Sequence, residues 1–133
     1  MSVSALADDP TIDDKEIIWR RIHELKVVPD DNLKRKRPSS NCFHDSTGGH
    51  LSVYIASEAI SSQAIMQGAK ERFLVSLSVG FIRQLGLGIT RDSSTGGPGH
   101  ALLLGKKAGH IRDQMAKTAT WVEPYAPEEM PKV

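Results

Sequence analysis

The sequence contains little cysteine and few aromatic residues, and it lacks any long apolar run. Cys42 is the single cysteine among 133 residues, so an internal disulfide is excluded. Phe, Trp and Tyr together make up 5% of the chain, too few to form an obvious series of base-stacking platforms. No apolar run approaches the roughly 20 residues needed to cross a bilayer. These absences argue against a disulfide-stabilised secreted domain, a membrane protein and a single-strand nucleic-acid binder.

An excess of charge of one sign is also missing, because 17 basic and 16 acidic residues give a formal net charge of +1. This balance creates no overall field that would attract nucleic acid or an anionic membrane. The one strong local run, KRKR at 34–37, is typical of a solvated loop. The N-terminus has neither the basic nor the apolar segment of a secretory signal. We expect a reduced, cytoplasmic protein that binds neither nucleic acid nor membrane.

The length fits one domain with a modest core, flanked by two polar ends. Residues 1–15 are small, polar and acidic, and we expect them to form a flexible arm. Residues 16–123 hold the apolar segments of a single α+β domain. Residues 124–133 contain three prolines and are predicted to form an extended tail. Arm and tail are both suited to docking on a protein partner.

Apolar patterning predicts an α+β fold, with a single small mixed or antiparallel sheet of about five strands and two or three helices. Strands are expected at residues 16–22, 51–57, 73–79, 87–92 and 100–107. Helical spacing predicts helices within 57–71 and 108–122, and a helical turn at 80–86.

The most apolar segments are 51–55, 73–79 and 100–105, which we expect to be adjacent strands covered by the helix within 108–122. The predicted core then includes Leu74, Leu77, Leu102, Leu104, Ile111 and Met115.

Two loops of similar sequence precede predicted strands: DSTGGH at 45–50 and DSSTGGPGH at 92–100. Asp, Ser and Gly favour turns, because Asp and Ser bond nearby amides and Gly adopts positive φ without steric cost. Successive amides of glycine-rich turns also form nests for anions. No Lys-Ser or Lys-Thr follows the glycines, and a strand stands where a phosphate loop requires a helix. We therefore favour turn chemistry over an anion nest.

Polar residues beside these strands form a candidate site for phosphate and proton transfer. An arginine fixed on a strand binds phosphate bidentately, and serine hydroxyls add further bonds. The candidate ligand-binding residues are Arg20, Arg21, Arg37, Ser39 and Ser40. Histidine and carboxylate side chains at strand ends are suited to proton transfer. The candidate catalytic residues are His44, His100 and Glu58.

A metal site is not expected, because HxH and HExxH spacings are absent and only one cysteine is present. For Cys42 itself two interpretations remain open. It is either a small buried apolar side chain or, with His44 as base, a nucleophile. The first is the usual fate of a free cysteine.

The segments WRRI at 19–22 and VYIASE at 53–58 resemble the opening of ADP-ribosyltransferase-like proteins, including the RES-type NAD-degrading toxins. The resemblance implies that Arg20 or Arg21 contacts an NAD phosphate and that VYIAS leads from a strand toward a helix. The chain also resembles small prokaryotic proteins in four places: the segments RRI and RPSS, the segment HAL followed by GKK, and a WV near the end.

Two functions follow as expectations. The first is a nucleotide-binding protein, with NAD as ligand and ADP-ribosyltransferase-like or NAD-consuming activity. The alternative is a non-catalytic accessory protein of a bacterial toxin–antitoxin or phage-defence system, docked through its arm or tail.

Overall fold

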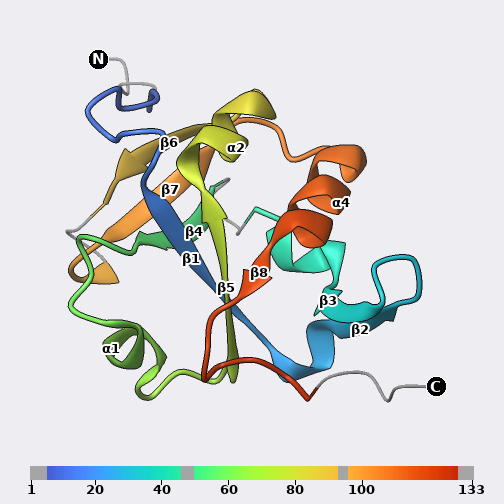
Figure 1. Cartoon of the computed structure of the whole chain (residues 1–133). Coiled ribbons are helices and arrows are strands. Elements are labelled where there is room, and N and C mark those ends of the chain that lie inside the picture. The colour runs from blue at the N-terminus through green and yellow to red at the C-terminus, as the bar shows by residue number, and fades with distance from the viewer. Residues whose placement is uncertain (1–5, 46–49, 93–95, 129–133) are drawn as a thin grey trace.

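The computed structural model describes residues 6–45, 50–92 and 96–128, and its centre is a six-stranded sheet with the order β6-β7-β4-β1-β5-β8 (Figure 1). Every neighbouring pair of strands runs antiparallel. The strands are β1 (Ile17–Ile22), β4 (Leu51–Ile55), β5 (Phe73–Ser78), β6 (Gly88–Arg91), β7 (His100–Leu104) and β8 (Thr120–Trp121). With its helices this sheet confirms the predicted α+β fold.

A separate two-stranded hairpin, β2 (Val27–Asp30) and β3 (Arg35–Pro38), lies in a stretch that the sequence presents as a connection. Its two prolines and its run of basic residues concealed it, since proline is confined to edge strands. Lys34 adopts a φ of 59° in the turn between the two strands.

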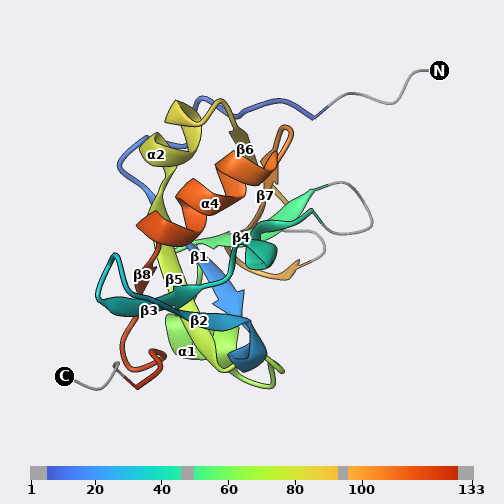
Figure 2. The same cartoon turned by 90° about the vertical axis from the view of Figure 1, so that its right-hand side faces the viewer.

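Serine side chains begin two of the α-helices. Ser61 accepts a hydrogen bond from the amide of Ala64, and Ser78 accepts one from the amide of Phe81. The α-helices are α1 (Ser62–Met66), α2 (Val79–Gln84) and α4 (Gly109–Thr118), and the 3-10 turns are η1 (Glu24–Lys26) and η2 (Ser40–Phe43). In both views α1 lies at the other end of the sheet from α2 (Figures 1 and 2). α1 is much shorter than the predicted segment.

The core lies between one face of the sheet and the helix α4 with η2. Figure 2 shows α4 lying across the strands, and its Met115 belongs to the same buried cluster as Phe43 of η2. Strand β4 alternates buried and half-buried residues, so Leu51, Val53 and Ile55 point into this core. We call this side of the sheet the inner face, and the opposite side the outer face.

The predicted core is confirmed for four of its six members and differs for two. Leu74, Leu77, Leu104 and Met115 are buried, whereas Leu102 and Ile111 are half-buried. Leu102 pairs with Ser52, so it points to the outer face. The expected adjacency of three strands is wrong for β5, because β1 lies between β4 and β5.

The N-terminal arm differs from the flexible segment predicted at 1–15. Residues 1–5 lie outside the described part of the chain, but from Asp8 onward the arm is bonded to the domain. The amide of Asp9 donates to the Ile89 carbonyl at 2.8 Å, and the Asp8 carboxylate accepts from the Ile89 amide at 2.9 Å. Ile12 is 1% exposed and belongs to the core. The acidic composition conceals this one apolar anchor.

The beginning of the predicted tail is also attached. The amide of Leu74 donates to the Tyr125 carbonyl at 3.0 Å, and the amide of Val122 donates to the Leu74 carbonyl at 2.9 Å. Residues 129–133 of the predicted tail lie outside the described residues. Among the helices that the structure describes, none has the length and apolar character needed to cross a membrane.

Candidate functional site

The two neighbouring arginines of β1 lie on opposite faces of the sheet, as strand alternation requires. Arg20 points inward. Its Nε donates to the Cys42 carbonyl at 3.0 Å and its Nη1 to the Ser52 carbonyl at 2.9 Å. Burial is the main cause that lowers the pKa of this guanidinium from its usual value. Through these two hydrogen bonds Arg20 links β1 to η2 and β4 on the inner face of the sheet.

Arg21 points outward into a pocket of about 280 Å³, which we call the Arg21 pocket. The other residues that line this pocket are Tyr54, Ile60, Ala64, Ile65, Gln67, Gly96 and Pro98. The guanidinium carbon of Arg21 lies 5.6 Å from the centre of the Tyr54 ring, within the range of a cation–π contact. Among the described residues, the pocket thus combines the Arg21 guanidinium and the Gln67 amide with the Tyr54 ring and apolar side chains.

His100 of β7 is the cross-strand partner of Tyr54 in β4. The two rings meet edge to face, with centroids 5.4 Å apart. Arg21, Tyr54 and His100 therefore come from the adjacent strands β1, β4 and β7. Two of the residues predicted from the sequence, Arg21 and His100, are brought together here, and Tyr54 between them was not predicted. Its alternation with buried Val53 and Ile55 was the available signal.

The proton of His100 is fixed by its partner. The Nδ1 atom lies 2.9 Å from the Asp92 carbonyl oxygen, which can only accept, so Nδ1 carries a hydrogen. In the neutral ring Nε2 is then the acceptor. The side chain of His100 is 10% exposed. The geometry gives His100 one defined tautomer.

The second glycine-rich loop forms one wall of the Arg21 pocket. Gly97 and Gly99 have φ values of 85° and 83°, which explains the need for glycine at both positions. Gly96 lies directly against the ring of His100, so that a Cβ there would overlap it. Residues 93–95 of this loop and 46–49 of the first loop lie outside the described residues. The described part of the second loop uses glycine for turns, as predicted, and at Gly96 also for close approach to His100.

Arg21 is held more loosely than Arg37 and Arg91, the arginines that pair closely with carboxylates. Its Nη1 lies 3.3 Å from the Ile65 carbonyl, and its Nε lies 3.7 Å from the Glu71 carboxylate, beyond hydrogen-bond distance. In contrast, Arg37 and Arg91 each approach a carboxylate oxygen to 2.7 Å. A guanidinium has five N–H donors, so Arg21 retains donors for a ligand.

The remaining predicted ligand-binding residues have structural partners elsewhere. Arg37 pairs with Asp30 within the hairpin, and this bond is the first cause that lowers the pKa of Asp30. Ser39 caps η2 by accepting from the amide of Asn41, and Ser40 is the first residue of that turn. None of these residues lines the Arg21 pocket.

The two other candidate catalytic residues, Glu58 and His44, do not line the Arg21 pocket and have partners elsewhere. Glu58 accepts bonds from Arg91 at 2.7 to 3.0 Å, and this interaction lowers the pKa of the Glu58 carboxyl. The ring nitrogens of His44 lie 2.9 and 3.0 Å from Nη1 of Arg112. Arg37, Ser39 and His44, which the sequence suggested would face one cleft with Arg20 or Arg21, bond instead to Asp30, to the η2 backbone and to Arg112.

Cys42 is buried, and burial is the first cause that raises the pKa of its thiol. A raised thiol pKa disfavours the thiolate, which is the reactive form. This environment supports the interpretation of Cys42 as an apolar side chain.

A buried ion pair, which the sequence did not indicate, joins the first glycine-rich loop to the end of β7. Nζ of Lys107 lies 2.8 Å from Asp45, and it donates to the carbonyls of Leu103 and Gly105 at 2.8 and 2.7 Å. The side chain of Lys107 is 2% exposed. The Lys107 ammonium thus donates two hydrogen bonds and forms one ion pair, which suits a structural role.

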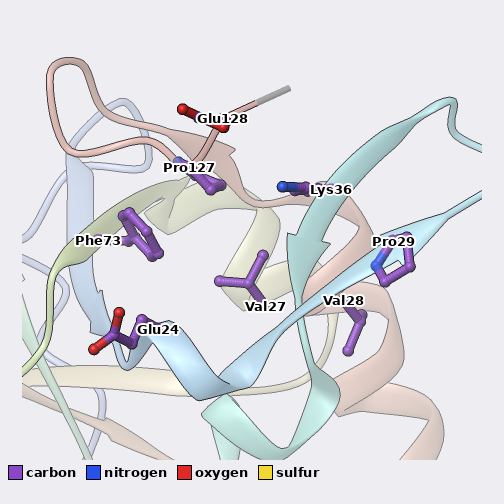
Figure 3. Close-up of a pocket in the computed structure, with 8 residues that line it drawn as sticks. All are labelled: Glu24, Val27, Val28, Pro29, Lys36, Phe73, Pro127 and Glu128. Atoms are coloured by element: carbon purple, nitrogen blue, oxygen red, sulfur yellow. The ribbon is translucent and has the colours of Figure 1, made fainter. Parts of the chain in front are cut away.

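A second pocket of about 320 Å³ lies between the hairpin and the beginning of the tail. Figure 3 shows the apolar side chains Val27, Phe73 and Pro127 around it, with Lys36 and Glu128 at the rim. No histidine and none of the predicted site residues line it. Its chemistry is that of a mainly apolar groove.

No metal centre is indicated within residues 6–45, 50–92 and 96–128, where no three His, Cys, Asp or Glu side chains are placed to hold an ion.

Comparisons with protein-family models, with curated proteins and with solved structures found no match. A function for this chain is therefore inferred from the geometry of the Arg21 pocket.

Proposed function

We propose that this protein binds a phosphate-bearing nucleotide of the NAD or ADP-ribose type in the Arg21 pocket. The observation that carries the proposal is the loosely held Arg21 guanidinium at a pocket whose other lining is mostly apolar. Arginine pairs with phosphate through two parallel N–H bonds, and the Gln67 amide adds a polar group at the same pocket.

The proposed role of His100 is to support the floor of the pocket beneath Tyr54. Its Nδ1 is engaged by Asp92, and its ring is covered by Gly96. This arrangement holds the Tyr54 ring in place, and the ring in turn supports the Arg21 guanidinium. In this proposal Arg21 binds the ligand, and His100 is a positioning residue. The proposed function is therefore binding, with no catalytic step assigned.

Calorimetric titration with NAD, ADP-ribose and ATP tests the proposal. Wild-type protein is expected to bind at least one of them, and Arg21→Ala to weaken that binding by roughly tenfold or more, since a charge-assisted bond is worth about 1.5–3 kcal/mol. Arg72→Ala is the matched control, because Arg72 is 71% exposed and forms only a 3.8 Å ion pair with Glu24. Absence of binding at millimolar nucleotide, or equal losses in both variants, would refute the proposal.

The second candidate function is that of an accessory protein in a bacterial toxin–antitoxin or phage-defence system. The groove around Val27, Phe73 and Pro127 favours it, since apolar grooves are typical of peptide recognition (Figure 3). The described part of the N-terminal arm, which was expected to dock on a partner, is bonded to β6 and α2 instead. The groove is therefore the better candidate surface for this function.

A further inference from the structure

We infer that the mouth of the Arg21 pocket is a subsite for a planar ring, bounded by Ile60 and Pro98. This inference rests on the proposed function and specifies its ligand class. The pocket would hold one nucleoside monophosphate unit, with its phosphate at Arg21 and its base at the mouth. Phosphate binding by Arg21 alone does not require a base, so the ring subsite adds a second requirement on the ligand.

The exposure of Ile60 is the first observation that supports a ring subsite. Its side chain is 78% exposed although it lines the pocket. Ala64, Ile65 and Pro98 continue the apolar lining beside it. A ligand ring at this position would remove the apolar surface of Ile60 from water, which is favourable in proportion to the area covered. A bare sugar phosphate has no group that could cover it.

A close backbone contact holds the segment of Pro98 against the segment of Ile60. Gly99 has a φ of 83°, and a Cβ there would come within 2.7 Å of the Ala59 amide nitrogen. The Gly99 carbonyl also accepts from the Ile55 amide at 2.8 Å. Because Pro98 precedes Gly99 and Ile60 follows Ala59, this contact joins the two segments that carry the apolar residues of the subsite.

The size of the pocket limits the ligand to one unit. Its volume is about 280 Å³. Sites for drug-sized ligands begin at about 300 Å³, so a whole dinucleotide does not fit inside. Of an NAD-type ligand, one base, its ribose and one phosphate would occupy the pocket, and the rest would extend into solvent. A mononucleotide is consequently the largest ligand that should fit fully inside the pocket.

Titrations with AMP and with ribose 5-phosphate separate the ring from the phosphate. Ile60→Ser should weaken AMP binding by roughly tenfold while leaving ribose 5-phosphate binding unchanged, because only AMP carries a planar base. Arg21→Ala should weaken the binding of both ligands. Leu25→Ser is the matched control, since Leu25 is 82% exposed on η1 and does not line the pocket. As both apolar residues are exposed, neither variant should impair folding.

The outcomes distinguish the inference from the function on which it rests. If AMP binds and Ile60→Ser weakens both ligands equally or neither, the ring subsite is refuted while nucleotide binding stands. If wild-type protein binds AMP and ribose 5-phosphate with the same affinity, the ring contributes nothing and the inference also fails. If no nucleotide binds to the wild type, both proposals fail together.

Discussion

Arg20 and Arg21 are neighbours in β1, yet one guanidinium bonds to backbone carbonyls on the inner face and the other lines a pocket on the outer face. Arg20 bonds to the carbonyls of Cys42 and Ser52, whereas Arg21 lies over the ring of Tyr54. A slip of one residue in the register of β1 would exchange the two. The sheet register thus decides which arginine is structural and which is available to a ligand.

The first prediction is that the two arginines differ in their effect on stability. Arg20→Ala should lower the free energy of unfolding by about 3 kcal/mol, because it leaves two partly buried carbonyl groups without their charged donor. Arg21→Ala should lower it by under about 1 kcal/mol, since its ion pair is long and partly exposed. Urea denaturation followed by circular dichroism measures both. Equal losses would contradict the assignment of the two faces.

The second prediction concerns Gly96. A methyl group there would overlap the His100 ring, so Gly96→Ala should displace the loop and change the chemical shifts of His100 and Tyr54 in NMR spectra. Gly109→Ala is the control, because its Cβ would meet only Arg112, at 3.7 Å. Unchanged shifts of His100 in Gly96→Ala would show that the loop does not rest on this ring.

The third prediction concerns the N-terminal arm. Ile12→Ala should cost about 2–5 kcal/mol, as expected for a large buried aliphatic side chain. The variant should also speed exchange of the Ile89 amide, which bonds to Asp8. Leu6→Ala, at a residue that is 50% exposed, should change neither quantity. An Ile89 amide equally protected in Ile12→Ala would show that the arm is held without its apolar anchor.

The fourth prediction is a loss of stability in acid. The pKa of Asp9 is lowered first by its bonds with Thr11, and that of Glu58 by its bond with Arg91. Carboxyl groups with a lowered folded-state pKa stabilise the fold above their unfolded pKa, and this contribution disappears as the pH falls through the folded pKa.

Unfolding free energy should therefore be constant near neutral pH and should fall below about pH 4.5. Glu58→Gln should reduce this slope, because glutamine does not titrate. Urea titrations at a series of pH values measure the slope in both proteins. An identical slope in the variant would show that Glu58 contributes nothing to it.

Much of the main sheet could be predicted from local patterns. The strand predicted at 51–57 corresponds to β4, and the helical turn predicted at 80–86 corresponds to α2. The hairpin could not be predicted, since its prolines and basic residues disfavour strands in general. Strand order was also out of reach, because the pairing of β1 with β5 depends on segments far apart in the chain.

The candidate site was predicted only in part, for the same physical reason. Arg21 and His100 were both named as candidates, but their meeting around Tyr54 follows from the order of β1, β4 and β7. Arg37 and Glu58 were named on residue type alone, and type does not reveal that Asp30 and Arg91 already engage them. The partners of a charged side chain are a property of the fold.

The central position of β1 has a consequence for how the chain folds. Strand β1 is the first to be synthesised, yet both of its neighbours, β4 and β5, are made later and pair with it across long loops. Loop closure must precede these pairings, and sheets dominated by non-local pairs fold on a timescale of about milliseconds to seconds. During that interval Ile18 and Ile22, which are fully covered in the folded domain, remain open to solvent. Folding on the ribosome cannot complete the sheet around β1 until β5 has emerged, so the nascent chain is most prone to aggregate before that point.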